Sequence, residues 1–205
     1  MTRASPFPAA LRVVQIVDCA GAADGAHLDA TLSAGVTAVW LRDPAATGRR
    51  LYEAAGSLLL RCRRLDAALL VGDRVDVALA VGADGVQLGQ RSVPVARVRP
   101  WYRGWIGASC HHAAEVASAV EGGADHVVLS PVFGVPDKGA ALGVEGLRAL
   151  LGVTRVPAVA LGGVEPGTVG LLRDLGLAGV AVIRALRDAA DPVAAARTLA
   201  TVTPG

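Results

Sequence analysis

The chain of 205 residues carries 20 basic and 18 acidic side chains, a net charge of +2, and 53% of its residues are hydrophobic. Charges of both signs are interspersed and only 3% of the residues are aromatic, which argues against nucleic acid as a partner, because that surface needs clustered basic residues and stacking rings. The apolar runs are too short to cross a bilayer, so we expect no membrane partner.

Short apolar runs alternate with helical segments along the whole chain. Runs that are apolar on both faces predict parallel strands covered on both sides. The predicted strands are Arg12–Val17, Ala38–Leu41, Ala68–Val71, Gly85–Leu88, Trp105–Ala108, His126–Leu129, Ala158–Leu161 and Gly179–Ile183. The predicted helices are Gly25–Ser33, Gly48–Arg64, Val75–Val81, Pro94–Trp101, Ala113–Glu121, Val144–Leu151, Pro166–Leu175 and Pro192–Val202.

Repeated strand–helix units in a chain of this length predict one α/β domain, a single (βα)8 TIM barrel. We expect the barrel to span residues 11–203, after a flexible arm at residues 1–10. The alternative is an open doubly wound sheet. That fold favours a Gly-x-Gly-x-x-Gly turn after the first strand, which residues 17–23 do not supply.

Polar residues gather where the predicted strands end. In a barrel these ends form one rim, and barrel enzymes place their chemistry there, although a solvated rim would also be polar. The rim residues are Asp18, Arg42, Asp43, Asp73, Arg74, Gln87, Gln90, Ser109, Cys110, His111, Ser130 and Arg184.

Glycines follow the seventh predicted strand, and an arginine follows the eighth. Glycine lets backbone N–H groups approach an anion closely, and the loops after the last two barrel strands are a frequent phosphate site. We therefore predict that Gly162, Gly163, Ile183 and Arg184 bind phosphate. The alternative is that the two glycines only form a tight turn.

Lys138 is the only lysine in the sequence and lies in a long segment, residues 131–142, after the sixth predicted strand. Such a loop can fold over a ligand, and an ammonium there could reach a phosphate or carboxylate. The alternative is an ordinary surface charge. The cysteines Cys19, Cys62 and Cys110 show no paired spacing, and no secretory signal is visible, so we expect reduced thiols and a cytoplasmic protein.

From about residue 14 to residue 199 the chain resembles the thiamine phosphate synthases and the related thiazole tautomerases. The resemblance rests on the segment Gly72–Gln90 and on Gly107-Ala-Ser-Cys-His111, Ser130-Pro-Val-Phe133, Leu161-Gly-Gly163 and Gly179-Val-Ala-Val-Ile183. It implies a (βα)8 barrel that handles a thiazole phosphate, with the phosphate held by backbone after the last two strands.

The synthases join a pyrimidine pyrophosphate to a thiazole phosphate with Mg²⁺, and this chain departs from their pattern. Residues that differ from it are Trp40 for glutamine, Pro44 for lysine, Gly72 for asparagine, Gln87 for histidine, Ser92 for a metal carboxylate, and Val135 and Asp137 for two threonines. Asp73 is left as a metal ligand only if the protein is a synthase. Because a departing pyrophosphate needs its charge neutralised, these changes predict weak synthase activity.

The expected function is therefore that of a metal-independent thiazole tautomerase, an isomerase without cofactor that aromatises a carboxythiazole phosphate. His111, with Ser109, would move the proton, since an imidazole titrates near neutral pH. Gln87 and Ser109 would orient the ring, and Arg42 or Lys138 would meet the carboxylate.

Two alternatives stay open: a Mg²⁺-dependent thiamine phosphate synthase, and a non-catalytic regulator that binds thiazole phosphate. A homodimer through apolar helix faces is also left open. Trp40 could stack on a ring or fill the former pyrimidine site, and its role stays unassigned.

Overall fold

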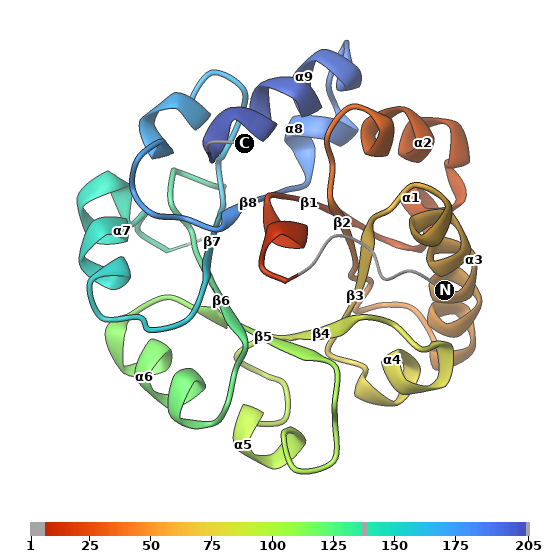
Figure 1. Ribbon diagram of the computed structural model, residues 1–205, viewed down its shortest axis with the longest axis horizontal. Coiled ribbons are helices and arrows are strands. Elements are labelled where there is room, and N and C mark those ends of the chain that lie inside the picture. Colours follow the sequence, from red (N-terminus) through yellow and green to blue (C-terminus); the bar gives the residue numbers. More distant parts are fainter. Residues whose placement is uncertain (1–6, 137–138, 204–205) are drawn as a thin grey trace.

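The computed structural model describes residues 7–136 and 139–203. Eight parallel strands form a closed barrel in the order β1 to β8, with β1 paired to β8 (Figure 1). The strands are β1 Val13–Val17, β2 Ala38–Leu41, β3 Ala68–Gly72, β4 Gly85–Leu88, β5 Trp105–Cys110, β6 His126–Leu129, β7 Ala158–Leu161 and β8 Gly179–Val182. The predicted (βα)8 barrel is confirmed.

The helices form a ring outside the barrel (Figure 1). They are α1 Cys19–Ala23, α2 Gly25–Ser33, α3 Gly48–Arg64, α4 Val75–Val81, α5 Val95–Val98, α6 Ala113–Glu121, α7 Gly143–Leu151, α8 Arg184–Arg187 and α9 Pro192–Leu199, with 3₁₀ turns η1 Ala9–Leu11, η2 Val169–Leu172 and η3 Ala200–Val202. Among these residues no helix is both long and apolar enough to span a membrane.

Several helix predictions differ from the structure, and α5 covers only Val95–Val98 of the predicted Pro94–Trp101. The helix expected at residues 166–175 is only the short turn η2, because Gly167 and Gly170 weaken an α-helix there. Neither α1 nor α8 was expected, since each begins one or two residues after a strand and is too short to show a helical period.

The strand side chains supply two apolar cores. One lies inside the barrel and the other between the barrel and its helices, since successive side chains of a strand point to opposite faces. The barrel interior is filled by Val14, Ile16, Trp40, Leu70, Val128, Val159 and Ala181 with smaller neighbours. This filling makes the barrel a packed core and confines ligands to its ends.

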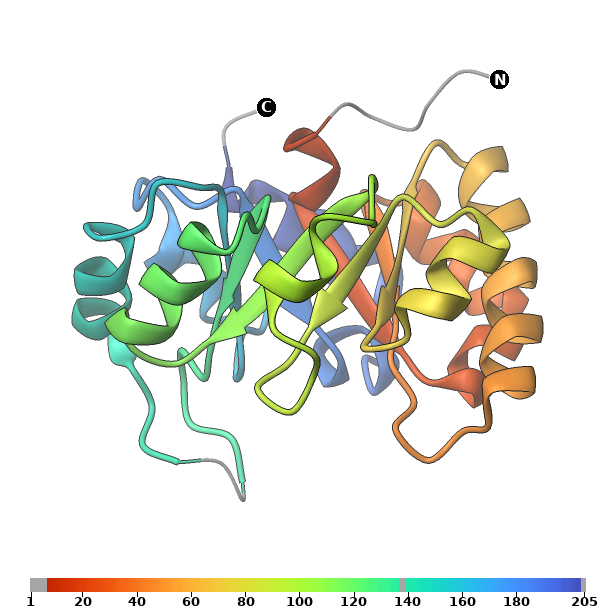
Figure 2. The ribbon, with the colours of Figure 1, turned by 90° about the horizontal axis from the view of Figure 1, so that it is seen from below.

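The N-terminal end of the barrel is closed by the chain that precedes β1. The ring of Phe7 lies 5.2 Å from that of Trp105 and 6.1 Å from that of His126, between ring centroids. Ala10 and Leu11 are fully buried. Phe7, Ala10 and Leu11 therefore pack against this end of the barrel. Figure 2 shows η1 at the opposite end of the barrel from the β6–α7 connection.

Two turns from helix to strand contain the same arrangement, an aspartate that bonds both an arginine and a backbone N–H of the neighbouring strand. Asp84, before β4, accepts hydrogen bonds from both terminal nitrogens of Arg63 at 2.9 Å and from the N–H of Leu69 at 2.8 Å. Asp125, before β6, accepts from Arg99 at 2.8 Å and from the N–H of Ile106 at 2.7 Å. Each carboxylate thus ties a helix to the first residues of the strand next to its own.

Candidate active site

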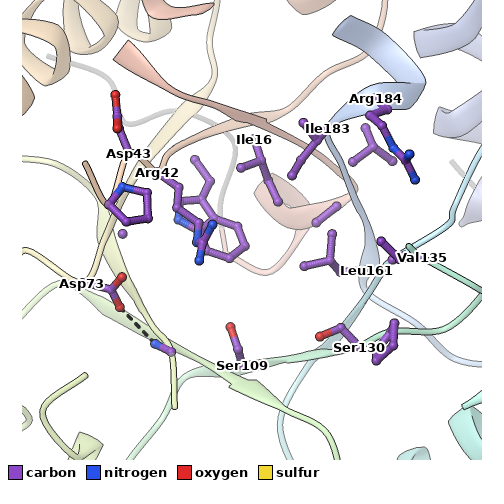
Figure 3. Close-up of a pocket in the computed structure, with 18 of the residues that line it drawn as sticks. Ile16, Arg42, Asp43, Asp73, Ser109, Ser130, Val135, Leu161, Ile183 and Arg184 are labelled. Carbon is purple, nitrogen blue, oxygen red and sulfur yellow. Dashed lines mark hydrogen bonds between the residues drawn. The ribbon is translucent and has the colours of Figure 1, made fainter. Parts of the chain in front are cut away.

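A cavity of about 740 Å³ opens at the carboxyl ends of the strands. Its lining residues come from all eight strands or the segments that follow them, and the labelled residues surround it (Figure 3). The cavity brings together Arg42, Asp73, Ser109, His111, Gly162, Gly163, Ile183 and Arg184, which are candidates from the sequence. Lys138 lies outside the described residues.

Gly162 and Gly163 form a turn that a larger residue would not adopt. Their φ angles are +95° and +66°. A Cβ atom on Gly163 would lie 2.7 Å from the Cβ of Phe133, so the turn also depends on close approach to the segment after β6. In the described chain the N–H of Gly163 has no hydrogen-bond acceptor. The same glycines therefore form a tight turn and leave the Gly163 N–H available to bind an anion.

The start of α8 adds further donors on the same side of the cavity. The first N–H groups of any helix lack partners within it. In α8 these belong to Arg184 and Ala185, since the N–H groups of Leu186 and Arg187 donate to the Ile183 carbonyl, and Ile183 is 38% exposed. Together with the Gly163 N–H, this end of the barrel suits an anion.

Arg42 and Arg184 approach the cavity from different sides (Figure 3). Arg42 follows β2 and reaches toward the middle, whereas Arg184 stands at the rim beside β8. Neither forms an ion pair with any described residue. Arg74 is different, because its Nε and Nη2 contact Asp76 at 2.8 and 2.5 Å.

Two departures from the synthase pattern are coupled in space. The indole of Trp40 is buried and lines the cavity. A Cβ atom on Gly72 would lie 2.9 Å from Trp40 Nε1. Gly72 therefore leaves the space that the indole occupies, and an asparagine at that position would need the indole to move.

Asp73 is the acidic residue with room for a cation. Its Oδ1 accepts hydrogen bonds from the Gly89 N–H at 3.2 Å and from the Ser92 hydroxyl, while Oδ2 has no partner within the described chain. Asp43 is less suitable, because the N–H groups of Cys19 and Ala45 bind its two oxygens and hold its pKa below the usual range.

No group of three His, Cys, Asp or Glu residues suited to a metal occurs in the described residues. Mg²⁺ is commonly held by one or two carboxylates together with water and substrate phosphates. The donors present therefore fit Mg²⁺ shared between Asp73 and a bound phosphate, rather than a cage made by the protein alone.

His111 stands at the cavity rim and is fixed by Glu115, one helical turn further along. Glu115 Oε2 lies 2.6 Å from the His111 N–H and 3.1 Å from Nδ1. Burial acts to raise the pKa of Glu115, but hydrogen bonds from His111 and Gln90 outweigh it and hold the pKa below its usual range. Glu115 was not expected at the site from the sequence, although its i,i+4 spacing from His111 is visible there.

Gln87 lies beneath the cavity rather than in its lining. Only 1% of it is exposed, its Nε2 donates to Ser109 Oγ at 3.2 Å, and its Oε1 lies 3.0 Å from His126 Nε2. A direct contact between Gln87 and a ring in the cavity would need this arrangement to open.

Comparison with known proteins decides the family. The family model described as thiamine monophosphate synthase matches residues 12–186. The chain belongs to this family. Thiamine-phosphate synthase of Laribacter hongkongensis is 43% identical over 176 residues, 83% of each chain, and that of Archaeoglobus fulgidus is 40% identical over 171 residues, 82% of this chain and 81% of the relative. The solved thiamine phosphate pyrophosphorylase of Pyrococcus furiosus has a TM-score of 0.88 at 33% identity, covering 96% of this chain and 97% of the other.

The prediction of a tautomerase, and hence of an isomerase, is wrong. The curated relatives of this thiamine monophosphate synthase family member are named as synthases, which are transferases. The side chains that differ from the synthase pattern do not remove all charge neutralisation from the cavity. Backbone N–H groups remain around the cavity together with Arg42 and Arg184, which form no ion pair within the described chain, and donors of this kind also stabilise developing negative charge.

Proposed function

We propose that this protein is a thiamine-phosphate synthase, a transferase that joins a pyrimidine pyrophosphate to a thiazole phosphate and releases diphosphate. The observation that carries the proposal is a single cavity with anion-binding groups on two sides. The glycine turn and α8 lie on one side, and Arg42 lies on the other, beside Asp73, which would act on an anion only through Mg²⁺.

In the proposed reaction the thiazole nitrogen forms a bond to the methylene carbon of the pyrimidine, while the bond from that carbon to the diphosphate oxygen breaks with its electrons. The thiazole phosphate would be held by the N–H groups of Gly163 and α8 and by Arg184. Arg42 would neutralise charge on the departing diphosphate.

Mg²⁺, held by Asp73 and the diphosphate, would supply further charge neutralisation to the leaving group. The condensation moves no proton to or from the thiazole ring. His111 is therefore assigned a binding role at the rim, where Glu115 fixes it.

In the test, purified protein is supplied with both substrates and Mg²⁺, and thiamine phosphate and diphosphate are measured. We expect the two products to form in equal amounts. Arg184→Gln should raise the KM for thiazole phosphate, since a charge-assisted hydrogen bond contributes about 1.5–3 kcal/mol. Arg187→Gln is the matched control, because Arg187 lies on the same helix outside the cavity and pairs with Asp188.

If the unmodified protein forms no thiamine phosphate in this assay, the proposal is wrong. If thiazole phosphate still bound, that result would favour the non-catalytic binder instead.

A further inference from the structure

A line of buried polar residues runs through the barrel to Ser109. Gln87 on β4, Gly107 on β5 and His126 on β6 stand in one row, since Gln87 pairs with Gly107 and Gly107 with His126. A Cβ atom on Gly107 would lie 2.1 Å from Gln87 Oε1 and 2.3 Å from His126 Nε2. The missing side chain of Gly107 is therefore what lets the other two meet across β5.

His126 is uncharged in this position. It is 1% exposed, and burial lowers its pKa from 6.5 to about 4. Its neighbour on the N-terminal side is the ring of Phe7. A neutral imidazole carries one proton, so the question is which nitrogen holds it.

The contacts favour a proton on Nε2. In the described chain His126 Nδ1 is buried without a partner. A buried N–H without an acceptor is rarer and more costly than a buried lone pair without a donor. Nε2 instead faces Gln87 Oε1, which can only accept.

This assignment fixes the direction of the next hydrogen bond. With its Oε1 accepting from His126, Gln87 turns its amide N–H₂ toward Ser109 Oγ. Ser109 then accepts from Gln87, and its own hydroxyl proton is free to point into the cavity that it lines.

We propose that His126 and Gln87 are positioning residues that make Ser109 a hydrogen-bond donor to an acceptor atom of the substrate. The order of donors is His126 to Gln87, Gln87 to Ser109, and Ser109 to the ligand. The part that concerns turnover rests on the proposed synthase function, whereas the donor order does not.

The donor order is tested by ¹⁵N NMR of the histidine rings at pH 7, with the His126 signals assigned by their loss in His126→Phe. We expect a neutral ring protonated at Nε2. A proton on Nδ1 would overturn the proposal, because Gln87 would then donate to Nε2 and Ser109 would have to donate inward. This measurement needs no activity, so it stands even if the synthase proposal fails.

The effect on the reaction is tested with Gln87→Glu, a nearly isosteric change. A carboxylate accepts from His126 and from Ser109 together, which turns the Ser109 proton away from the cavity. We expect Gln87→Glu and Ser109→Ala each to lower kcat/KM about tenfold, the value of one lost hydrogen bond, and the double variant to be no worse than either single one.

Gln15→Glu is the matched control. Gln15 is also a buried strand glutamine, 2% exposed, but it bonds Thr31 on α2 and does not line the cavity. Thermal unfolding of the two variants separates loss of stability from loss of the donor. If Gln87→Glu changes kcat/KM no more than Gln15→Glu does, the proposal is wrong, while activity of the unmodified protein would leave the synthase proposal intact.

Discussion

At the scale of single residues, Gly163 combines an unusual backbone conformation with a proposed role in phosphate binding. Gly163→Ala should destabilise the protein by about 1–3 kcal/mol, because alanine is strained at a φ of +66° and its Cβ would meet Phe133. It should also weaken phosphate affinity. Gly167→Ala is the control, since a Cβ there meets nothing within 4 Å. Equal unfolding midpoints of the two variants would contradict the expectation.

Ser92 should limit the affinity of the proposed Mg²⁺ site. Its hydroxyl donates to Asp73, where a carboxylate would add a second negative ligand. Ser92→Asp should raise Mg²⁺ affinity on the order of tenfold, since affinity follows the charge of the ligands. Calorimetric titration with Mg²⁺, in the presence of inorganic diphosphate, measures this, with Ser92→Ala as control. An unchanged affinity would place the ion away from Asp73.

Single residues also mark the limit of prediction from sequence. Arg42, Ser109, His111 and Arg184 were expected at the cavity and line it. Gln87 was expected there as well, but its amide group bonds His126 on another strand. Strand register, which brings the two residues together, cannot be read from the sequence. The one visible hint was Gly107, since a glycine inside a strand often marks close approach of another group.

At the scale of elements, the turns before β4 and β6 each hold a partly buried ion pair. Asp84→Asn keeps the shape of the side chain but removes its charge, which two Arg63 nitrogens and the Leu69 N–H now bind. It should lower the free energy of unfolding by about 1–3 kcal/mol in urea. Asp76→Asn should cost less than about 1 kcal/mol, because its pair with Arg74 is exposed. Equal costs would show that burial does not strengthen the Asp84 pair.

The strands were predicted to within two residues at each end, because continuous apolar runs between turns are distinctive. The helices after β1 and β8 were missed. Four or five residues give no period to detect. The miss at α8 concerns the proposed phosphate site, because the first N–H groups of α8 border the cavity.

At the scale of the whole molecule, His126 should make the protein sensitive to acid. Its pKa is about 4 in the folded chain and about 6.5 when unfolded. Between these values the unfolded chain binds the extra proton, so the free energy of unfolding should fall by up to about 3 kcal/mol as the pH drops from 6.5 to 4. His126→Phe should lack this part of the pH dependence. Urea unfolding at several pH values measures the difference, and parallel curves for the two proteins would contradict it.

The oligomeric state stays a prediction. Large apolar side chains are exposed at Leu60, Trp101 and Leu171, and the homodimer considered from the sequence would bury some such face. Sedimentation at several concentrations measures the oligomeric state.

Phe7, Ala10 and Leu11 fill the N-terminal end of the barrel, so over the described residues the cavity communicates with solvent at the carboxyl end of the strands alone. In a cavity that is closed at one end, the substrate that binds first lies deepest. What occupies the outer position must leave before the inner molecule can. Two reactants should therefore follow a compulsory sequence. Initial-rate kinetics would reveal this as one product competing with just one reactant.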